Sequence, residues 1–314
     1  MISFGPIPSR RLAKSLGINN TISPKVCTYG CVYCQIGETT RKSIERETFF
    51  KPQTIYEKVE KHIQQLSPDN YPDYLTFVSN GEPTLDLNLR KSIVLLKSLN
   101  IPIAVITNAS LLFDEQVRDD LQLADWVSLK MDAGDRDTWK KVNRPAVGLD
   151  FDKTIESINL FAGEYKGKLC TETMLIDGIN DSVNNIANVS EFIKGIKPLI
   201  AYLAIPTRPP SDESVNPADS EKLNMAWKIF NKNHINAEFL TGFEGTDTGF
   251  TGNIYDDILN ITAVHPLRQD SLIKLLRNNN ADISVVKSHI KQRLIRSTVY
   301  NGNKYYLRQY TLPV

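Results

Sequence analysis

The chain has 314 residues, of which 41% are hydrophobic and 23% charged, and its formal net charge is +1. This length and composition allow one large α/β domain or two ordinary domains, and they exclude a disordered chain and a uniformly basic nucleic-acid coat. No apolar run approaches the length of a membrane span, and residues 1–17 hold prolines and arginines where a signal peptide needs its apolar stretch, so we expect a cytoplasmic protein without a membrane segment.

Short apolar runs alternate with amphipathic stretches along most of the chain, a pattern typical of a parallel α/β fold. The runs predict six strands, at residues 15–20, 73–79, 101–107, 126–131, 169–175 and 199–205, with 236–240 as a candidate seventh. Apolar residues spaced at three or four predict helices at residues 52–66, 87–99, 114–123, 152–165, 183–196 and 217–234. Six such units indicate an incomplete (β/α)6 TIM-like barrel with function at the carboxyl ends of its strands, and an open doubly wound sheet is the alternative.

The charge balance changes near residue 261. Residues 262–314 contain nine Lys or Arg and two Asp or Glu, a balance of +7, whereas residues 1–261 contain 28 basic and 34 acidic residues. The tail predicts helices at 267–278 and 283–294 and a hairpin with strands at 295–300 and 304–310, because Asn301-Gly302 favours the turn that matches strand twist. We therefore expect a barrel domain, residues 1–261, and a small winged-helix-like module, residues 262–314. A structural cap on the barrel is the alternative for the module.

Three of the four cysteines lie within eight residues, in the segment Cys27-Thr-Tyr-Gly-Cys31-Val-Tyr-Cys34. A cubane iron–sulfur cluster normally takes four cysteines, so three thiolates on one tight loop would leave the fourth iron free to bind another ligand. A structural zinc site is the alternative, but it needs four closed ligands, and no further Cys or His lies near the triplet. Cys170 is far from the triplet, and we expect it to be a small buried residue.

The spacing of three and then two residues between the cysteines resembles the signature of the radical S-adenosylmethionine (SAM) superfamily. Tyr33 precedes the last cysteine, as an aromatic residue commonly does there, and is a candidate cofactor-binding residue. The resemblance implies a radical SAM type of barrel and a [4Fe–4S] cluster on Cys27, Cys31 and Cys34, with SAM bound at the open iron. It also implies that a reductant such as flavodoxin or ferredoxin drives the cleavage of SAM to methionine and a 5′-deoxyadenosyl radical, which abstracts hydrogen from a substrate.

The segment Asn80-Gly81-Glu82 comes after the second predicted strand. It resembles the superfamily's Gly-Gly-Glu motif with Asn80 in place of the first glycine, and we expect all three residues at the cofactor. Glycine lets a backbone approach a ligand closely, and nearby carbonyls can then accept hydrogen bonds from the SAM ammonium group. An ordinary turn at a strand end is the alternative. Asn108 ends the third predicted strand, from which its side chain could reach SAM.

Ser128, Lys130 and Asp132 alternate along the fourth predicted strand, so their side chains point to the same side. Polar side chains inside a barrel are unusual unless they are paired or functional. We expect Ser128 and Asp132 near the SAM ribose or carboxylate and Lys130 in an ion pair or in catalysis, which makes Lys130 and Asp132 the candidate catalytic residues. The resemblance places Glu172, on the fifth strand, in a second region that contacts SAM.

Three further segments resemble the branch of the superfamily related to wyosine synthases: Phe4-Gly-Pro-Ile-Pro-Ser-Arg-Arg11, Cys34-Gln-Ile-Gly37 and Arg208-Pro-Pro210. Wyosine synthases of this kind carry a second cluster on cysteines that precede the signature. Residues 1–26 contain no cysteine, so we expect one cluster here. The basic run of Arg10, Arg11 and Lys14 is either a solvated face or a lining of the barrel mouth that meets phosphate or carboxylate.

Three functions are compatible with these residues. The first is a radical SAM enzyme that acts on RNA, for example in tRNA modification, with phosphate contacts from the +7 module. The second is an enzyme that modifies a protein or peptide, or activates a glycyl radical in a partner, with the peptide bound along the hairpin edge. The third is a non-enzymatic iron–sulfur or zinc protein, which would have no use for the Asn80-Gly81-Glu82 turn.

Overall fold

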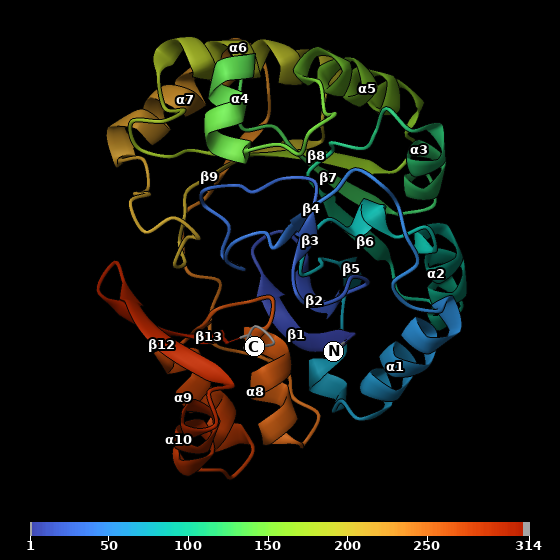
Figure 1. The fold of residues 1–314 in the computed structure, drawn as a ribbon, viewed down its shortest axis with the longest axis vertical. Helices are drawn as coiled ribbons and strands as arrows, with labels where there is room; N and C mark the ends of the chain where they lie inside the picture. Colours follow the sequence, from blue (N-terminus) through green and yellow to red (C-terminus); the bar gives the residue numbers. More distant parts are fainter. Residues whose placement is uncertain (1, 310–314) are drawn as a thin grey trace.

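A curled eight-stranded sheet lies at the centre of the computed structural model, which describes residues 2–309 (Figure 1). In sheet order, the strands are β1 (Ser3–Ser9), β2 (Ala13–Ile18), β5 (Tyr74–Phe77), β6 (Ile103–Thr107), β7 (Trp126–Lys130), β8 (Lys168–Met174), β9 (Ile200–Ala204) and β10 (Ala237–Leu240). Neighbours from β2 to β10 pair in parallel, and β1 pairs antiparallel with β2. The six predicted strands and the candidate seventh are therefore present, in an incomplete barrel of the TIM type.

Strand β1 was not predicted. Its sequence contains Pro6 and Pro8, and a proline cannot donate to a sheet ladder. The strand tolerates both because it lies at the edge of the sheet, where one row of backbone groups needs no partner strand.

Helices cover the outer face of the curled sheet in an arc (Figure 1). They are α1 (Pro52–Gln64), α2 (Leu89–Leu96), α3 (Glu115–Leu121), α4 (Arg136–Asn143), α5 (Phe151–Glu164), α6 (Val183–Ile196) and α7 (Ser220–Lys232), with short 3-10 helices η1 (Pro68–Asn70), η2 (Pro83–Leu85) and η3 (Lys97–Leu99). Of the α-helices, all but α4 were predicted within a few residues, and the 3-10 helices were not predicted as separate elements. Helix α4 was missed because it is short and mostly polar, although the Asp135 side chain caps its first turn by accepting from the Thr138 N–H.

The two faces of the sheet bury different side chains, as the alternation along a strand requires. Phe77 of β5 and Val127 of β7 point outward into the core between sheet and helices. Trp126, Cys170 and Tyr202 pack together on the inner face, so Cys170 is the small buried residue that was expected. The polar residues of β7 and β8 lie further along this inner face.

The C-terminal part forms a smaller body below the barrel in Figure 1. It contains α8 (Ile254–Thr262), β11 (Leu267–Arg268), α9 (Gln269–Asn278), α10 (Ser284–Lys291), β12 (Ile295–Tyr300) and β13 (Asn303–Arg308). The three strands form an antiparallel sheet in the order β11-β13-β12. The predicted helices and hairpin are present, and Tyr310, the predicted end of the second hairpin strand, lies outside the described residues.

One hydrophobic core joins this C-terminal module to the barrel edge. Phe4 and Ile7 of β1 pack with Ile258 and Ile261 of α8 and with Leu272 of α9. Helix α8 was not predicted, and it includes residues on both sides of the domain boundary expected after residue 261. That boundary was placed where the charge balance changes, and charge does not show which residues pack together. We propose instead that the module begins with α8, and its description as winged-helix-like remains a proposal. No helix in the described part of the chain is long and apolar enough to cross a membrane.

Candidate active site

Cys27 ends the short strand β3 (Val26–Cys27), and Cys31 and Cys34 lie on the loop that leads from it to the parallel strand β4 (Arg41–Lys42). The backbone of this cluster loop is held by the end of α4, because the Gly30 N–H donates to the Asn143 carbonyl at 2.9 Å and the Val32 N–H donates to the Val142 carbonyl at 3.0 Å. The hydroxyl of Ser211 donates to the Cys31 carbonyl at 2.9 Å. Helix α4, which was not predicted from the sequence, thus supports the cluster loop, which was.

Each of the three cysteine sulfurs faces a side-chain nitrogen donor. The pairs are Asn108 Nδ2 with Cys27 Sγ at 3.7 Å, Asn143 Nδ2 with Cys31 Sγ at 3.4 Å, and Lys25 Nζ with Cys34 Sγ at 3.0 Å. Donors of this kind stabilise negative charge on thiolate ligands. Lys25 and Asn143 were not singled out in the sequence, because nothing in their local pattern indicates which sulfur they reach.

The surroundings of the cluster loop shift the pKa values of the three thiols in different directions. Burial raises the pKa of Cys27 to about 12 and that of Cys31 to about 11. Burial also opposes ionisation of Cys34, but the adjacent Lys25 ammonium outweighs it and lowers the pKa of that thiol. Cys34 is therefore the thiol most ready to ionise, and thiolates are the form that binds metal.

The donor set fits a three-cysteine cluster better than a zinc ion. All four cysteines are free. A structural zinc site closes with four protein ligands, whereas the side-chain nitrogens that contact the three sulfurs are the amides of Asn108 and Asn143 and the ammonium group of Lys25, which donate rather than ligate. Three thiols that each have a polar donor and no fourth protein ligand are what a [4Fe–4S] cluster with one open iron requires.

Asn80 and Gly81 lie beside the strand that leads into the cluster loop. A Cβ atom on Gly81 would stand 1.8 Å from the Val26 carbonyl oxygen, so the glycine is needed for close packing against β3. This reason differs from the expected approach to SAM. The Asn80 amide donates to the Ser23 hydroxyl at 2.7 Å, while its Oδ1 is buried and has no hydrogen-bond partner among the described residues. An unpaired acceptor at this place fits the ammonium group of SAM.

Glu82 holds the ends of two strands together. Its buried carboxylate accepts from the N–H and hydroxyl of Thr84, from the Thr107 hydroxyl at 2.6 Å and from the Asn108 N–H at 2.8 Å. Burial raises the pKa of Glu82 despite these donors. The contacts join the turn after β5 to the end of β6, and they orient Asn108 toward the cluster loop.

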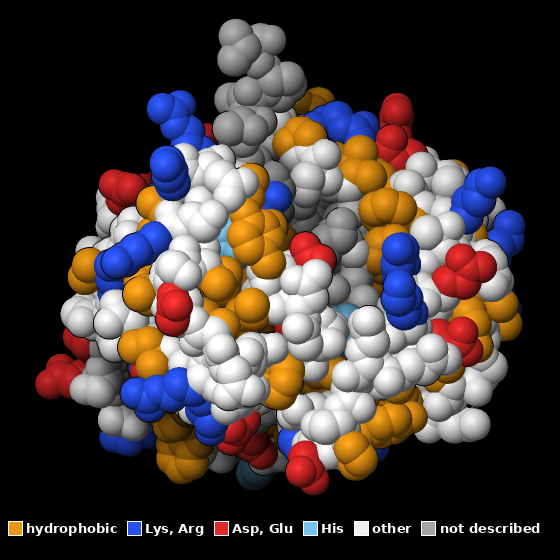
Figure 2. Space-filling model, turned by 90° about the horizontal axis from the view of Figure 1, so that it is seen from below, with side chains coloured by type: hydrophobic (Ala, Val, Ile, Leu, Met, Phe, Trp, Pro, Cys, Tyr) orange, Lys and Arg blue, Asp and Glu red, His pale blue; other side chains and the backbone are white. Residues whose placement is uncertain are grey.

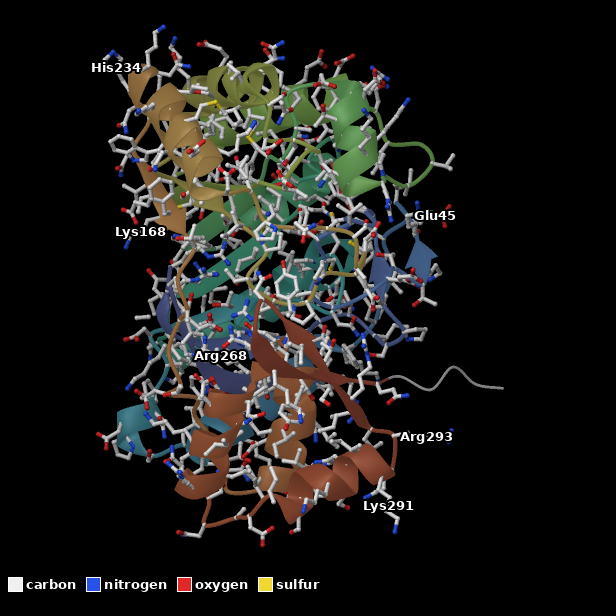
Figure 3. The ribbon with its side chains drawn as sticks, turned by 90° about the vertical axis from the view of Figure 1, so that its left-hand side faces the viewer. Glu45, Lys168, His234, Arg268, Lys291 and Arg293 are labelled. Atoms are coloured by element: carbon white, nitrogen blue, oxygen red, sulfur yellow. The ribbon has the colours of Figure 1, made fainter. Side chains whose placement is uncertain are left out.

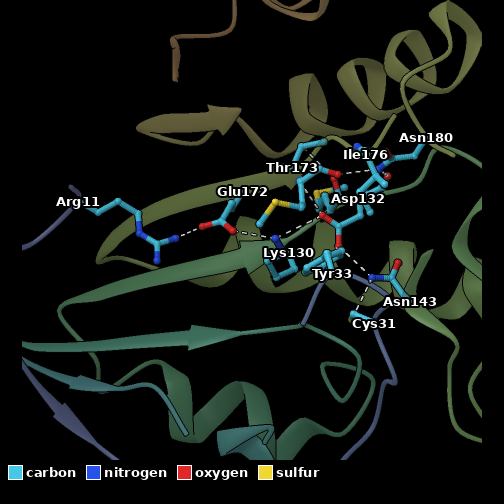
Figure 4. Close-up of polar contacts among 12 residues, drawn as sticks. Arg11, Cys31, Tyr33, Lys130, Asp132, Asn143, Glu172, Thr173, Ile176 and Asn180 are labelled. Atoms are coloured by element: carbon cyan, nitrogen blue, oxygen red, sulfur yellow. Dashed lines mark hydrogen bonds and ion pairs between the residues drawn. The ribbon is translucent and has the colours of Figure 1, made fainter. Parts of the chain in front are cut away.

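A chain of polar contacts crosses the inner face of the barrel, from the β1–β2 turn to the cluster loop (Figure 4). Glu172 of β8 pairs with Arg11 and with Lys130, whose Nζ lies 2.8 Å from Glu172 Oε1. Lys130 Nζ also lies 3.4 Å from Asp132 Oδ1 and 4.9 Å from the centre of the Tyr33 ring. The Tyr33 hydroxyl donates to Asp132. Four predicted site residues, on three different elements, therefore meet.

These contacts decide the charge of Lys130. Burial alone would lower the pKa of Lys130, but the carboxylates of Asp132 and Glu172 outweigh it and raise that pKa. Burial alone would raise the pKa of Glu172, but Lys130 and Arg11 lower it to about 2. Of the two alternatives for Lys130, the structure thus contains the ion pair.

Asp132 and Ser128 differ in how fully their polar atoms are used. Asp132 additionally accepts from the Met174 N–H at 2.8 Å and from Asn143 Nδ2 at 2.9 Å, so both of its oxygens are bonded within the protein. The Ser128 hydroxyl is buried on the inner face without a hydrogen-bond partner among the described residues. Ser128 therefore has free capacity for a ligand. Asn180, from the loop after β8, donates to the Asp132 carbonyl at 2.8 Å.

Residues 21–189 match the model of the Radical SAM superfamily. The chain belongs to the radical SAM superfamily. It is 42% identical to the UPF0026 protein MJ1312 of Methanocaldococcus jannaschii over 311 aligned residues, and the alignment covers 98% of this chain and 96% of that protein.

Two solved structures have a similar fold. TYW1 with a lysine-pyruvate adduct bound matches with a TM-score of 0.54 and 16% identity, over 71% of this chain and 75% of that chain. Streptococcus suis SuiB bound to precursor peptide SuiA matches with a TM-score of 0.54 and 14% identity, over 74% of this chain and 50% of that chain. At these identities the likeness concerns the fold alone.

Membership confirms the resemblance drawn from the cysteine motif. The protein is a radical SAM enzyme that uses a [4Fe–4S] cluster and SAM, and the non-enzymatic alternative is set aside. The observed contacts, rather than the family match, say how each residue of this chain would serve those cofactors.

Proposed function

We propose that this radical SAM enzyme modifies RNA. When bound, the cluster and SAM supply a 5′-deoxyadenosyl radical that abstracts hydrogen from the substrate. Cys27, Cys31 and Cys34 would hold the cluster, and a reductant such as flavodoxin or ferredoxin would supply the electron. The remaining steps, which are binding, orientation and exclusion of water, belong to the side chains of the chain itself.

Side chains from four elements would bind and orient SAM in this proposal. Asn80 Oδ1 and the Ser128 hydroxyl offer unpaired polar atoms, and Asn108, Glu82 and Gly81 fix the backbone beside the cluster loop. Lys130 and Asp132, with Tyr33 and Glu172, would act as positioning residues, because their polar atoms already bind one another. A paired lysine and a fully bonded aspartate hold geometry rather than exchange protons.

The observation that carries the RNA proposal is a cavity between the cluster loop and the module. It has a volume of about 170 Å³ and is lined by Gly37 and Glu38 on the loop side and by Arg296 and Arg308 on the module side. Cations of the module thus reach the immediate neighbourhood of the cysteines. A phosphate backbone bound on the module could follow them to the reaction centre.

Further cations on the module are exposed and unpaired. Lys291, Arg293 and Arg296 form no ion pair with any residue in the described range, whereas Arg268 and Lys274 pair with Asp270 and Asp247. Figure 3 shows Lys291 and Arg293 at the outer end of the module. Figure 2 shows the lower face of the molecule, where Lys and Arg side chains are spread among uncharged and acidic ones. An RNA would therefore meet separate points of positive charge along the module.

The test is equilibrium binding of a bulk tRNA preparation at several salt concentrations. Replacing Lys291, Arg293 and Arg296 with Gln should weaken binding and reduce the salt slope by about one unit for each lost phosphate contact. Gln at Lys153, Lys228 and Lys232, three exposed lysines of α5 and α7, is the control of equal charge and should leave the slope unchanged. Equal slopes for both triple variants would reject RNA contact by the module.

A peptide substrate is the second candidate, because β12 is an edge strand. The sheet order β11-β13-β12 leaves one side of β12 without a strand partner in the described chain, and Val299 on it is 70% exposed. A free edge can bind an extended peptide through backbone hydrogen bonds. Substrate binding whose affinity does not depend on salt concentration, and which is lost when Val299 is replaced by Pro, would favour a peptide substrate.

A further inference from the structure

A second cavity, of about 130 Å³, opens on the inner face of the barrel beside the cluster loop. Its walls come from β1, β2, β5 and β6 and from the loops that follow β9 and β10. Three guanidinium groups line it, those of Arg10 and Arg11 from the β1–β2 turn and that of Arg208 from the loop after β9. None of the roles assigned above to the cluster or to SAM uses this group of arginines as a binding site.

Two of the three arginines are neutralised within the protein. Arg11 pairs with Glu172, and Arg208 pairs with Glu244. Both pairs are largely shielded from solvent, with side chains no more than 18% exposed. Buried pairs of this kind keep their geometry, so they form a fixed, charge-balanced wall.

Arg10 differs from the other two because it makes no direct ion pair with a carboxylate of the described residues. Its Nη1 donates to the Leu240 carbonyl at 2.6 Å and to the Gly242 carbonyl at 2.8 Å, and it forms no ion pair with any residue from 2 to 309. Burial and the charge of Arg208 lower the pKa of Arg10, while the carboxylates of Glu244 and Glu172 oppose that shift. Among the three arginines, Arg10 is therefore the one whose guanidinium has no direct carboxylate contact in the described chain, and the residue stays exposed to solvent.

The cavity is linked to the reaction centre by direct contacts. Arg208 Nη1 donates at 2.9 Å to Gln35 Oε1, and Gln35 directly follows the last cluster cysteine and also lines the cavity. On the other side, Arg11 reaches Lys130 through Glu172. A group held by these arginines would thus lie within the same barrel interior as the chain of contacts that ends at the cluster loop.

We infer that this cavity binds an anionic group of the substrate, a phosphate or a carboxylate, and that Arg10 supplies the decisive charge. The guanidinium fork suits both anions, since it offers parallel N–H donors in one plane. Arg11 and Arg208 keep donors directed at the same space while their own charges are balanced. The inference rests on the proposed function only in treating the barrel interior as the substrate pocket.

The test is calorimetric titration of the cluster-loaded protein, saturated with SAM and without reductant, at constant ionic strength. Inorganic phosphate is the probe in one arm and acetate in the other. We expect saturable binding of at least one anion at a single site, and the arm with the higher affinity identifies the group. Arg10→Gln should weaken that affinity by at least about tenfold. Arg90→Gln, which alters an exposed arginine that also donates to a backbone carbonyl, should leave it unchanged.

Two results would overturn the inference. They are the absence of saturable binding in both arms and equal affinities in wild type and Arg10→Gln. If Arg10→Gln lowers thermal stability and leaves the anion affinity intact, Arg10 only stabilises the loop after β10, and the inference fails. The RNA proposal is judged separately by its salt slope, so phosphate binding without RNA binding would reject the RNA and keep the anion site.

Discussion

The ammonium group of Lys25 lies 3.0 Å from the sulfur of Cys34 and donates also to the Gly37 carbonyl at 2.8 Å. Lys25 is 6% exposed, so this contact is shielded from water and from salt. A cation fixed beside a cluster ligand stabilises the more negative, reduced state of the cluster. Lys25 is therefore placed to tune the ease of reduction, on which radical formation depends.

Replacing Lys25 with Met should make the cluster harder to reduce. Loss of about 1.4 kcal/mol of stabilisation corresponds to a shift of about 59 mV toward more negative potential in a one-electron couple. A redox titration followed by electron paramagnetic resonance measures it. Lys42→Met, which changes an exposed lysine of β4 at the far end of the same loop, is the control. Identical potentials in wild type and Lys25→Met would contradict the assignment.

The three clustered cysteines should each be required for the cluster, and Cys170 should not. Alanine at Cys27, Cys31 or Cys34 removes a thiolate that no other cysteine in the described chain replaces, since Cys170 is packed against Trp126 and Tyr202. We expect ~4 iron atoms per chain in the reconstituted wild type and in Cys170→Ala, as one cluster requires. Iron analysis checks this. Iron near eight per chain would reveal a second cluster and refute the expectation.

Gly81→Ala should disturb the cluster loop as well as SAM binding. The added Cβ would stand 1.8 Å from the Val26 carbonyl oxygen, and the strand containing Val26 also carries Cys27. Forcing extra volume into such packing costs roughly 1–3 kcal/mol. Iron content and SAM affinity should both fall. Gly163→Ala is the matched control, because a Cβ there meets nothing within 4 Å, and unchanged iron content in Gly81→Ala would show that β3 adapts.

The sequence predicted most of the barrel because each of its elements signals locally. Short apolar runs mark β5 to β9, and the three-cysteine spacing marks the cluster loop. Helix α4 escaped prediction because its eight residues are mostly polar and bury Trp139 and Val142 on a narrow face. Helix α8 escaped because charge, rather than its apolar face, was used to draw the boundary.

The contacts inside the site could not be predicted in the same way. Arg11 and Glu172 are 161 positions apart, and Arg208 meets Glu244 and His265 from segments separated by dozens of residues. Spacing along one element reveals which residues share a face, as it did for Ser128 and Lys130. It does not reveal which face of another element they meet, because that depends on how the sheet curls.

His265 should make the protein less stable in mild acid. Burial lowers the pKa of His265 to about 4, with a further contribution from Arg208, whereas an unfolded chain has an imidazole pKa of about 6.5. Between these values the unfolded state binds a proton that the folded state does not. The free energy of unfolding therefore falls as pH decreases from about 6.5 to about 4, by roughly 3 kcal/mol in total.

Urea unfolding at several pH values, compared between wild type and His265→Gln, measures this contribution together with the change at Glu244, whose carboxylate lies 3.1 Å from His265 Nε2 and whose pKa His265 helps to lower. Asp86 acts in the opposite direction, since burial raises its pKa to about 6, but it is present in both proteins and cancels in the difference. The wild type should lose stability relative to the variant as the pH falls through this window. A difference that does not vary with pH would mean that His265 is not buried in its neutral form.

The C-terminal module should not be separable from the barrel. Residues 262–314 supply Leu272 and other apolar side chains to the core that buries Phe4, Ile7, Ile258 and Ile261. Exposing four such side chains costs roughly 6 kcal/mol or more, which is comparable to the ~5–15 kcal/mol stability of a whole domain. Deletion of 262–314 should therefore give an aggregated chain, checked by size-exclusion chromatography.

Leu272→Ala should lower the free energy of unfolding by about 2–5 kcal/mol in one cooperative transition, while Val299→Ser, at an exposed site, should not. A soluble deletion variant that still holds its cluster would show that the shared core is dispensable, and would leave substrate contact as the reason for the module.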